Sequence, residues 1–238
     1  MNILITNDDG IDAPGISVLA RAAAKFGAVT VVAPAEQCSA MSHRITLSRR
    51  MRIEKRELDI PGVAAYALDG TPADCVKAAL DAILPQKPDV VLSGINNGYN
   101  VGFDVAYSGT VGAAMEAVMS GIPAIALSQN DVGGFGITEQ YLPQILEELL
   151  PAAPSDKEIW NVNIPTDRCN GILRGRTVSL GGYYNGTMYV AEEDGEMHVQ
   201  YPPLVPTDFS THPAADGSDL RAVVNGYISI GKVRCPVM

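Results

Sequence analysis

Short apolar runs alternate with helical patterns over the first two thirds of the chain. Asn2–Thr6 is a brief run of branched residues that stops at Gly10, which predicts a buried strand ending in a turn. Pro14 then opens a segment with apolar residues at helical spacing, which ends before Gly27. Further strands are predicted at 29–33, 89–93, 122–128 and 158–165, with helices beginning near residues 71, 108 and 138. This alternation predicts an α/β fold with an open, mostly parallel sheet.

Two regions depart from this alternation. Between the second strand and residue 71, three shorter runs favour a hairpin or an antiparallel edge, namely Ile45–Leu47, Met51–Lys55 and Val63–Leu68. From about Thr166, short alternating segments interrupted by Gly181-Gly182-Tyr183-Tyr184 and Tyr201-Pro202-Pro203 predict β-hairpins that could reach a partner subunit. A short helix at 219–224 and a strand at 226–230 would return to the core. We therefore expect a catalytic domain over 1–165 and a C-terminal β-hairpin arm over 166–238.

Composition excludes several classes of protein. The 238-residue chain is 47% hydrophobic, as expected of a globular enzyme, and its net charge of -10 argues against binding a nucleic-acid polymer. The four cysteines form no CxxC pair or dense pattern, so neither a disulfide framework nor a zinc site is predicted. We find no signal-peptide pattern and no apolar run long enough to cross a bilayer, and expect a cytoplasmic protein without a membrane partner.

The first candidate chemistry lies where the first strand ends. A turn at Gly10 would let the carboxylates of Asp8 and Asp9 converge, and converging carboxylates repel each other unless a cation lies between them. In an open parallel sheet, ligands bind beyond the carboxyl ends of the strands. An isolated Asp-Asp-Gly is nevertheless more often only an acidic turn before a helix. A cation site is therefore indicated only if other loops bring further ligands to the same place.

Three further loops leave the same predicted edge of the sheet. One carries Ser39, a second carries Asn96 and Asn100, and the third is Ser108-Gly109-Thr110, which offers amides, hydroxyls and a helix N-terminus to an anion. Carboxylate, hydroxyl and amide oxygens suit a hard cation such as Mg²⁺ or Mn²⁺ better than Zn²⁺. His43 is the one histidine near these loops; it could pack locally, contact a phosphate or donate a proton.

Five ordered motifs resemble the SurE family of metal-dependent nucleotidases. They are Thr6-Asn-Asp8-Asp9-Gly10-Ile-Asp-Ala-Pro-Gly15, Val32-Ala-Pro34 with Ser39, Asp69-Gly-Thr-Pro-Ala-Asp-Cys-Val76, Ser93-Gly-Ile-Asn96 and Tyr107-Ser-Gly-Thr-Val111. The resemblance continues in Asn161-Val-Asn-Ile-Pro165 and in Gly217-Ser-Asp219 with Gly226-Tyr-Ile-Ser229, so it covers most of the chain. Two segments depart from the family pattern: the Ser39 loop and the C-terminal segment, where Ile230-Gly231-Lys232 follows Ser229 in place of Thr-Pro-Leu. The loop before Ser39 has Ala35-Glu36 in place of Asp-Arg, and Ala40 stands where the family has glycine.

The resemblance implies a Rossmann-like three-layer sandwich and a phosphomonoesterase that removes the 5′- or 3′-phosphate of nucleoside monophosphates. It places one divalent metal ion per subunit, Mg²⁺ or Mn²⁺, on Asp8, Asp9, Ser39 and Asn96. Asp8, Asp9 and Asn96 would be catalytic, and Ser108, Gly109, Thr110, His43 and Asn100 would contact the substrate. It also implies a homodimer or dimer of dimers joined through the C-terminal arm.

Two mechanisms and one other class of protein stay open at this point. Hydrolysis could proceed by in-line attack of a metal-activated water, or one of Asp8 and Asp9 could act as base or nucleophile. A receiver-like signalling module also holds Mg²⁺ on an acidic pair after its first strand, without hydrolase activity. Such a module needs a lysine after its fifth strand, where this chain has Ser128-Gln129-Asn130.

Overall fold

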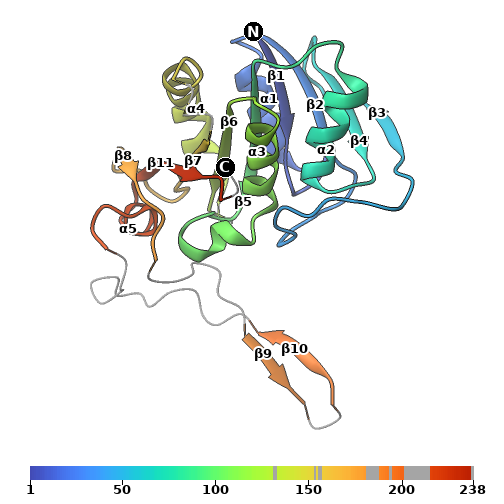
Figure 1. Cartoon of the computed structure of the whole chain (residues 1–238). Helices are drawn as coiled ribbons and strands as arrows, with labels where there is room; N and C mark the ends of the chain where they lie inside the picture. Colours follow the sequence, from blue (N-terminus) through green and yellow to red (C-terminus); the bar gives the residue numbers. More distant parts are fainter. Residues whose placement is uncertain are drawn as a thin grey trace.

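The fold is built on a mostly parallel sheet, as the alternation of strands and helices predicts. The computed structural model describes residues 1–130, 133–152, 154, 157–180, 188–192, 195–200 and 215–236. Over these residues the main sheet has nine strands in the order β3-β4-β2-β1-β5-β6-β7-β11-β8 (Figure 1). The strands are Asn2–Thr6 (β1), Ala28–Pro34 (β2), Ile53–Arg56 (β3), Ala64–Leu68 (β4), Val90–Asn97 (β5), Ala124–Gln129 (β6), Glu158–Ile164 (β7), Ile172–Arg176 (β8) and Ile228–Arg234 (β11).

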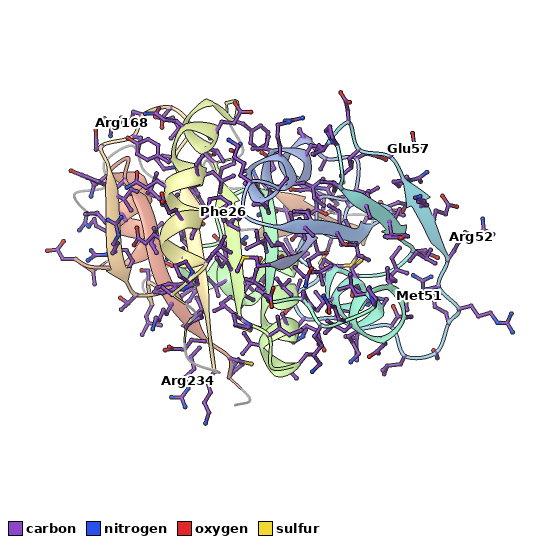
Figure 2. The ribbon with its side chains drawn as sticks, turned by 90° about the horizontal axis from the view of Figure 1, so that it is seen from above. Phe26, Met51, Arg52, Glu57, Arg168 and Arg234 are labelled. Atoms are coloured by element: carbon purple, nitrogen blue, oxygen red, sulfur yellow. The ribbon has the colours of Figure 1, made fainter. Side chains whose placement is uncertain are left out.

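The strand directions bring the polar loops together. Strands β4, β2, β1, β5, β6 and β7 are parallel, whereas β3 runs antiparallel to β4 and β11 antiparallel to β7. The loops that follow the parallel strands therefore leave one edge of the sheet, where ligands bind in open α/β folds. Seen from above, Arg52 and Glu57 lie at one end of the molecule and Arg168 and Arg234 at the other (Figure 2).

Helices cover both faces of this sheet. The helices are Pro14–Ala23 (α1), Pro72–Ala78 (α2), Gly109–Met119 (α3), Gly136–Leu149 (α4) and Asp219–Val224 (α5); α2 continues into a π-helical segment, Ala79–Ile83, and a 3₁₀-helix, Gly102–Ala106, precedes α3. Proline occupies the first position of α1 and α2, where its missing N–H costs nothing. The predicted cap at Thr71 is a complete capping box with Asp74, which satisfies two amides at the start of α2.

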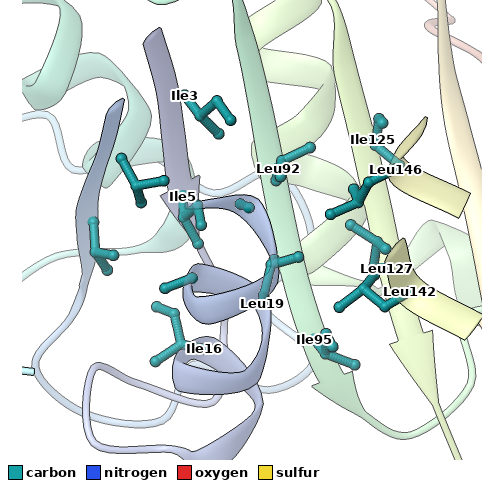
Figure 3. Packing of buried hydrophobic residues seen from close by; sticks show 14 of the residues in the cluster. Ile3, Ile5, Ile16, Leu19, Leu92, Ile95, Ile125, Leu127, Leu142 and Leu146 are labelled. Carbon is teal, nitrogen blue, oxygen red and sulfur yellow. The ribbon is translucent and has the colours of Figure 1, made fainter. Parts of the chain in front are cut away.

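The alternation of side chains along β1 separates two apolar layers. Ile5 belongs to one apolar layer, together with Leu19 of α1 and with Leu142 of α4, which Figure 3 shows beside Leu127. The preceding Leu4 belongs to the layer on the other face, together with Val111 of α3. All of these side chains are buried, and each contributes about 1.5–3 kcal/mol relative to exposure. The predicted three-layer α/β architecture is confirmed.

Two predicted elements around the site differ from the structure. The run Ile45–Leu47 is not a strand, because Asp74 binds the amide and hydroxyl of Thr46 at 2.8 and 2.7 Å and holds this segment as a loop beside α2. The strand predicted at 89–93 extends to Asn97, so that Asn96 lies within β5 and pairs with Ser128 of β6.

The C-terminal part contributes to the main sheet and to a separate hairpin. Strand β11 inserts between β7 and β8, and α5 forms at the predicted residues. Met188–Ala191 (β9) and Met197–Gln200 (β10) form an antiparallel pair that Figure 1 shows apart from the main sheet. The turns predicted at 181–184 and 201–203 lie outside the described residues, and the domain boundary at residue 165 stays a prediction. No helix in the described ranges has the length and apolarity to cross a membrane.

Candidate functional site

The turn after β1 is fixed by its own residues. Asn7 Nδ2 donates to the Gly10 carbonyl at 2.8 Å, and Gly10 has a φ of +98°, which a residue with a side chain rarely adopts. The amide of Cys38, from the loop after β2, donates to the Asp8 carbonyl at 2.7 Å. The two acidic residues therefore lie on a rigid turn that is joined to the Ser39 loop.

Asp8 is the buried carboxylate of the site. Thr110 donates to it twice, from its hydroxyl to Oδ1 at 2.5 Å and from its amide to Oδ2 at 3.2 Å. Burial raises the pKa of Asp8 from 3.8 to about 6; the charge of Asp9 adds to the rise and the Thr110 hydrogen bonds oppose it. A carboxylate held this way is stabilised by a nearby cation.

Asp9 connects β5 with the Ser39 loop. Its Oδ2 accepts a hydrogen bond from the Asn97 amide at 2.8 Å, and it is also hydrogen-bonded to the Gln37 side chain. Burial raises the pKa of Asp9, and these two hydrogen bonds oppose the rise. Gln37 in turn donates from Nε2 to Ser39 Oγ at 2.9 Å. A single side chain thus bridges two of the predicted metal ligands.

Asn96 presents its amide in a defined orientation. Its Nδ2 donates to the Gly98 carbonyl at 2.7 Å, which leaves Oδ1 as the acceptor on a partly exposed side chain. The next residue, Asn97, binds Asp9 through its backbone. The structure therefore connects Asp8, Asp9, Ser39 and Asn96 through the turn after β1, the loop after β2 and the end of β5.

The N-terminus of α3 meets this group of residues at Asp8. Ser108 is the N-cap, and its Oγ accepts the Val111 amide at 3.0 Å. A Cβ built on Gly109 would lie 2.9 Å from Asp8 Cβ and 3.0 Å from its Oδ2, so only glycine allows this close approach. Because the Thr110 donors are used by Asp8, the amide of Gly109 is the donor at this terminus for which no described residue provides an acceptor.

Two predicted substrate residues are held elsewhere. His43 Nε2 is hydrogen-bonded to Glu116 Oε2 at 2.8 Å, and Glu116 lies two turns along α3 from Ser108. Asn100 is buried, donates from Nδ2 to Ser128 Oγ at 2.8 Å and accepts from Asn161 at its carbonyl. Among the described residues neither side chain bonds to the proposed metal ligands, so their contact with substrate stays a prediction.

Sequence reasoning missed Gln37 and the structural role of Cys38. Gln37 is polar and two residues from Ser39, which is a weak signal, and the Cys38 contact uses the backbone, which no side-chain pattern reveals. Burial raises the pKa of the Cys38 thiol, Asp8 adds to that rise, and the positive charge of Arg44 opposes it. The Cys38 thiol itself donates to the carbonyls of Glu36 and Gly70, which is a structural role.

The donor atoms present fit a hard divalent cation. Two carboxylates with raised pKa values, a serine hydroxyl and an oriented amide oxygen are the oxygen ligands that Mg²⁺ and Mn²⁺ accept. In the described part of the chain no group of three or more His, Cys, Asp and Glu side chains could hold a metal. A cation would therefore depend on the neutral donors Ser39 and Asn96 and on substrate or water oxygens.

Known proteins share both the sequence and the fold. Residues 3–182 match the family model described as Survival protein SurE. A protein of Geotalea uraniireducens named 5′-nucleotidase SurE is 40% identical over 235 residues, which span 97% of this chain and 91% of that protein. One of Prochlorococcus marinus with the same name is 49% identical over 169 residues, covering 69% of this chain and 63% of that protein.

A solved structure extends the similarity to three dimensions. The crystal structure of the SurE protein from Aquifex aeolicus superposes with a TM-score of 0.81 at 34% sequence identity, and the match covers 100% of this chain and 95% of that one. The family model covers the turn after β1, the Ser39 loop, β5 and the start of α3, which together form the candidate site. From the sequence match and the shared fold, the chain belongs to the SurE family.

Proposed function

We propose that this protein is a metal-dependent phosphomonoesterase that hydrolyses nucleoside 5′-monophosphates, and also 3′-monophosphates, to the nucleoside and inorganic phosphate. The relatives that match nearly the whole chain are named 5′-nucleotidases, which supports a phosphoric monoester hydrolase. The receiver-like signalling module finds no support among these relatives.

One observation carries the proposal: the buried carboxylate of Asp8, next to the partly exposed Asp9, lies against the N-terminus of a helix. Asp8 contacts both Gly109 and Thr110 of α3. A helix N-terminus attracts anions, whereas the acidic pair attracts cations, so both attractions act at one place. A phosphate that bridges a cation and helix amides satisfies both.

The roles of the chain's residues follow from their contacts. Asp8, Asp9, Ser39 and Asn96 would hold one Mg²⁺ or Mn²⁺ per subunit, which when bound supplies positive charge to the phosphate and activates an attacking water. The Gly109 amide and the Ser108 hydroxyl would donate to non-bridging phosphate oxygens. Thr110 would keep the Asp8 carboxylate in its productive orientation. Water replaces the ester oxygen at phosphorus, and the nucleoside leaves with a proton.

The assembly and location belong to the same proposal. A two-stranded hairpin such as β9–β10 is marginally stable alone, which supports a homodimer or dimer of dimers that packs this arm against another subunit. The exposed Tyr189, Met197 and Val199 give the hairpin apolar surface to bury. We also propose a cytoplasmic location.

The experiment is release of inorganic phosphate from AMP, GMP, CMP and UMP, in 5′ and 3′ forms, by purified protein stripped of metal and then given Mg²⁺ or Mn²⁺. We expect release only with metal, and loss of activity in Asp8→Asn. Asp12→Asn is the matched control, because Asp12 is an exposed carboxylate in the same turn. Absence of release from every nucleotide with either metal refutes the proposed function, as does full activity of Asp8→Asn.

A further inference from the structure

The loops around the candidate site are strongly acidic. They carry Asp8, Asp9, Asp12, Glu36 and Asp104, in a chain of net charge -10. A phosphomonoester is itself an anion at neutral pH, so these carboxylates repel it. Positive charge near the site therefore has a large effect on substrate binding.

Arg44 is the one candidate in the sequence of these loops. It is the only lysine or arginine among residues 7–13, 35–46, 69–71, 98–108 and 130–135, which follow β1, β2, β4, β5 and β6 at the edge that carries the site. The loop after β7 carries Arg168, whose side chain packs against Gly226. The other basic residues of the segment after β2 begin at Arg49, beyond Thr46.

A hydrogen bond holds the backbone of Arg44 next to the site. The Thr71 hydroxyl donates to the Arg44 carbonyl at 2.5 Å. Pro72, which follows Thr71, packs against Gly109, since a Cβ built on Gly109 would lie 3.3 Å from Pro72 Cγ and 2.9 Å from Asp8 Cβ. A short series of contacts thus leads from Asp8 through Gly109 and Pro72 to the residue that binds Arg44.

The preceding residues are anchored on the other side. The Ser42 amide donates to the Tyr107 carbonyl at 2.9 Å, and the Ser42 hydroxyl donates to the Ala106 carbonyl at 2.8 Å, just before the N-terminus of α3. The backbone of this loop therefore stays in place between the starts of α2 and α3, and Arg44 is held with it.

The guanidinium of Arg44 is available to a ligand. Arg44 is exposed and forms no salt bridge with any carboxylate in the described part of the chain. By contrast, Arg49 is bound by both carboxylate oxygens of Asp69, at 2.6 and 3.0 Å. Since an arginine keeps its charge at every physiological pH, Arg44 contributes a lasting positive charge at this edge.

We propose that Arg44 is a substrate-binding residue whose guanidinium pairs with the phosphate of the substrate and offsets the acidic loops. The inference rests on the proposed function, because it assigns a residue to the same phosphate site. The planar guanidinium can donate two parallel hydrogen bonds to phosphate oxygens, which lysine cannot. Binding of this kind holds ground state and transition state alike, so it acts on KM more than on kcat.

The experiment compares Arg44→Met and Arg44→Lys with the control Arg50→Met. Arg50 is an exposed arginine of the same segment, outside the part that is hydrogen-bonded to the starts of α2 and α3. KM and kcat are measured for AMP with Mn²⁺, together with the inhibition constant of inorganic phosphate. We expect Arg44→Met to raise KM and the inhibition constant by about tenfold or more, with kcat within about threefold of wild type. Arg44→Lys should be intermediate, and Arg50→Met within about twofold.

Two outcomes overturn the assignment: an unchanged KM and phosphate inhibition constant in Arg44→Met, or an equal rise in Arg50→Met. If wild-type protein hydrolyses no nucleotide, the proposed function fails separately. Calorimetric binding of inorganic phosphate to the Mn²⁺-loaded protein then decides the role of Arg44. If circular dichroism shows that Arg44→Met is unfolded, Arg44→Gln and Arg44→Lys replace it in the same comparison.

Discussion

Thr110 binds Asp8 through two donors on one residue. Its hydroxyl donates to Oδ1 at 2.5 Å and its amide to Oδ2 at 3.2 Å, and both residues are buried. The first turn of α3 therefore sets the orientation of the carboxylate that ends β1. Helix and strand are far apart in the chain, yet they position the same functional group.

The Thr110 hydroxyl can be tested by an isosteric change. Thr110→Val removes the hydrogen bond and leaves a buried carboxylate oxygen without it, a loss of about 1–3 kcal/mol. We expect kcat/KM for nucleotide hydrolysis to fall by roughly tenfold to hundredfold. Thr110→Ser keeps the hydroxyl and should retain most activity. Equal activity of the valine and serine variants would argue against this role.

Gly109 gives a second test of the same contact. In Gly109→Ala the added methyl group would lie 2.9 Å from Asp8 Cβ, so Asp8 or the start of α3 must shift. We expect kcat to fall by at least about tenfold, because displacement of a catalytic group by a fraction of an ångström is costly. Gly136→Ala is the control: Gly136 also begins a helix, and its Cβ would meet no atom within 4 Å. The measurement is kcat of both variants. A comparable loss of kcat in Gly136→Ala would contradict a specific role for the contact between Gly109 and Asp8.

The sheet was largely predictable because buried strands and amphipathic helices leave strong periodic patterns. β1, α1 and α5 lie at the predicted positions, and Thr71 caps α2 as its sequence indicates. The strand predicted at Ile45–Leu47 was wrong. Its apolar residues resemble a strand, but the segment is held as a loop by hydrogen bonds to Asp74, which lies far along the chain. Local patterns carry no record of such distant hydrogen bonds.

The pKa of Asp8 predicts how stability depends on pH in protein stripped of metal. Burial raises this pKa to about 6, so the protonated form stabilises the fold. That contribution is fully present below about pH 4 and is lost as the pH rises through about 6. Asp8→Asn removes the free-energy cost of burying a charged carboxylate. At pH 7.5 the metal-free variant should therefore be more stable than wild type by on the order of 2 kcal/mol.

Thermal unfolding at several pH values measures this effect. The melting temperature of metal-free Asp8→Asn should exceed that of wild type at pH 7.5, and the two should converge near pH 4. Mn²⁺ should raise the melting temperature of wild type but not that of Asp8→Asn. If metal-free Asp8→Asn melts below wild type at pH 7.5, the charged Asp8 carboxylate does not destabilise the fold and the prediction is wrong.

Ala40 stands where the family pattern has glycine, and its backbone explains the preference. Its φ is +57°, a left-handed conformation that costs a residue with a side chain roughly 1–2 kcal/mol. Ala40→Gly relieves this strain, although it also increases the freedom of the unfolded chain. We expect a net gain of about 0.5–1 kcal/mol in chemical denaturation. Ala35→Gly, in the same loop without a positive φ, should lose stability; a loss in both variants would contradict the strain.

The proposed ligands come from the sequence, whereas the contacts that support them could not be predicted from it. Asp8, Asp9 and Ser39 follow strands that end at one edge, Asn96 lies in the last residues of β5 at the same edge, and their oxygen donors indicate the metal class. The roles of Gln37 and of the Asn97 amide depend on how loops fold over one another. His43 and Asn100 lie near in sequence, yet their side chains bond to Glu116 and Ser128. Proximity in the sequence could not tell residues that contact the proposed ligands, such as Gln37, from residues whose side chains bond elsewhere, such as His43.

The central claim is that one divalent cation binds where the turn after β1 meets β5 and α3. Anomalous scattering from crystals soaked with MnCl₂ tests it most directly. We predict one manganese peak per subunit, about 2.0–2.3 Å from oxygens of Asp8, Asp9, Ser39 and Asn96. No peak among these residues, or a peak at another place such as the His43–Glu116 pair, would contradict the account.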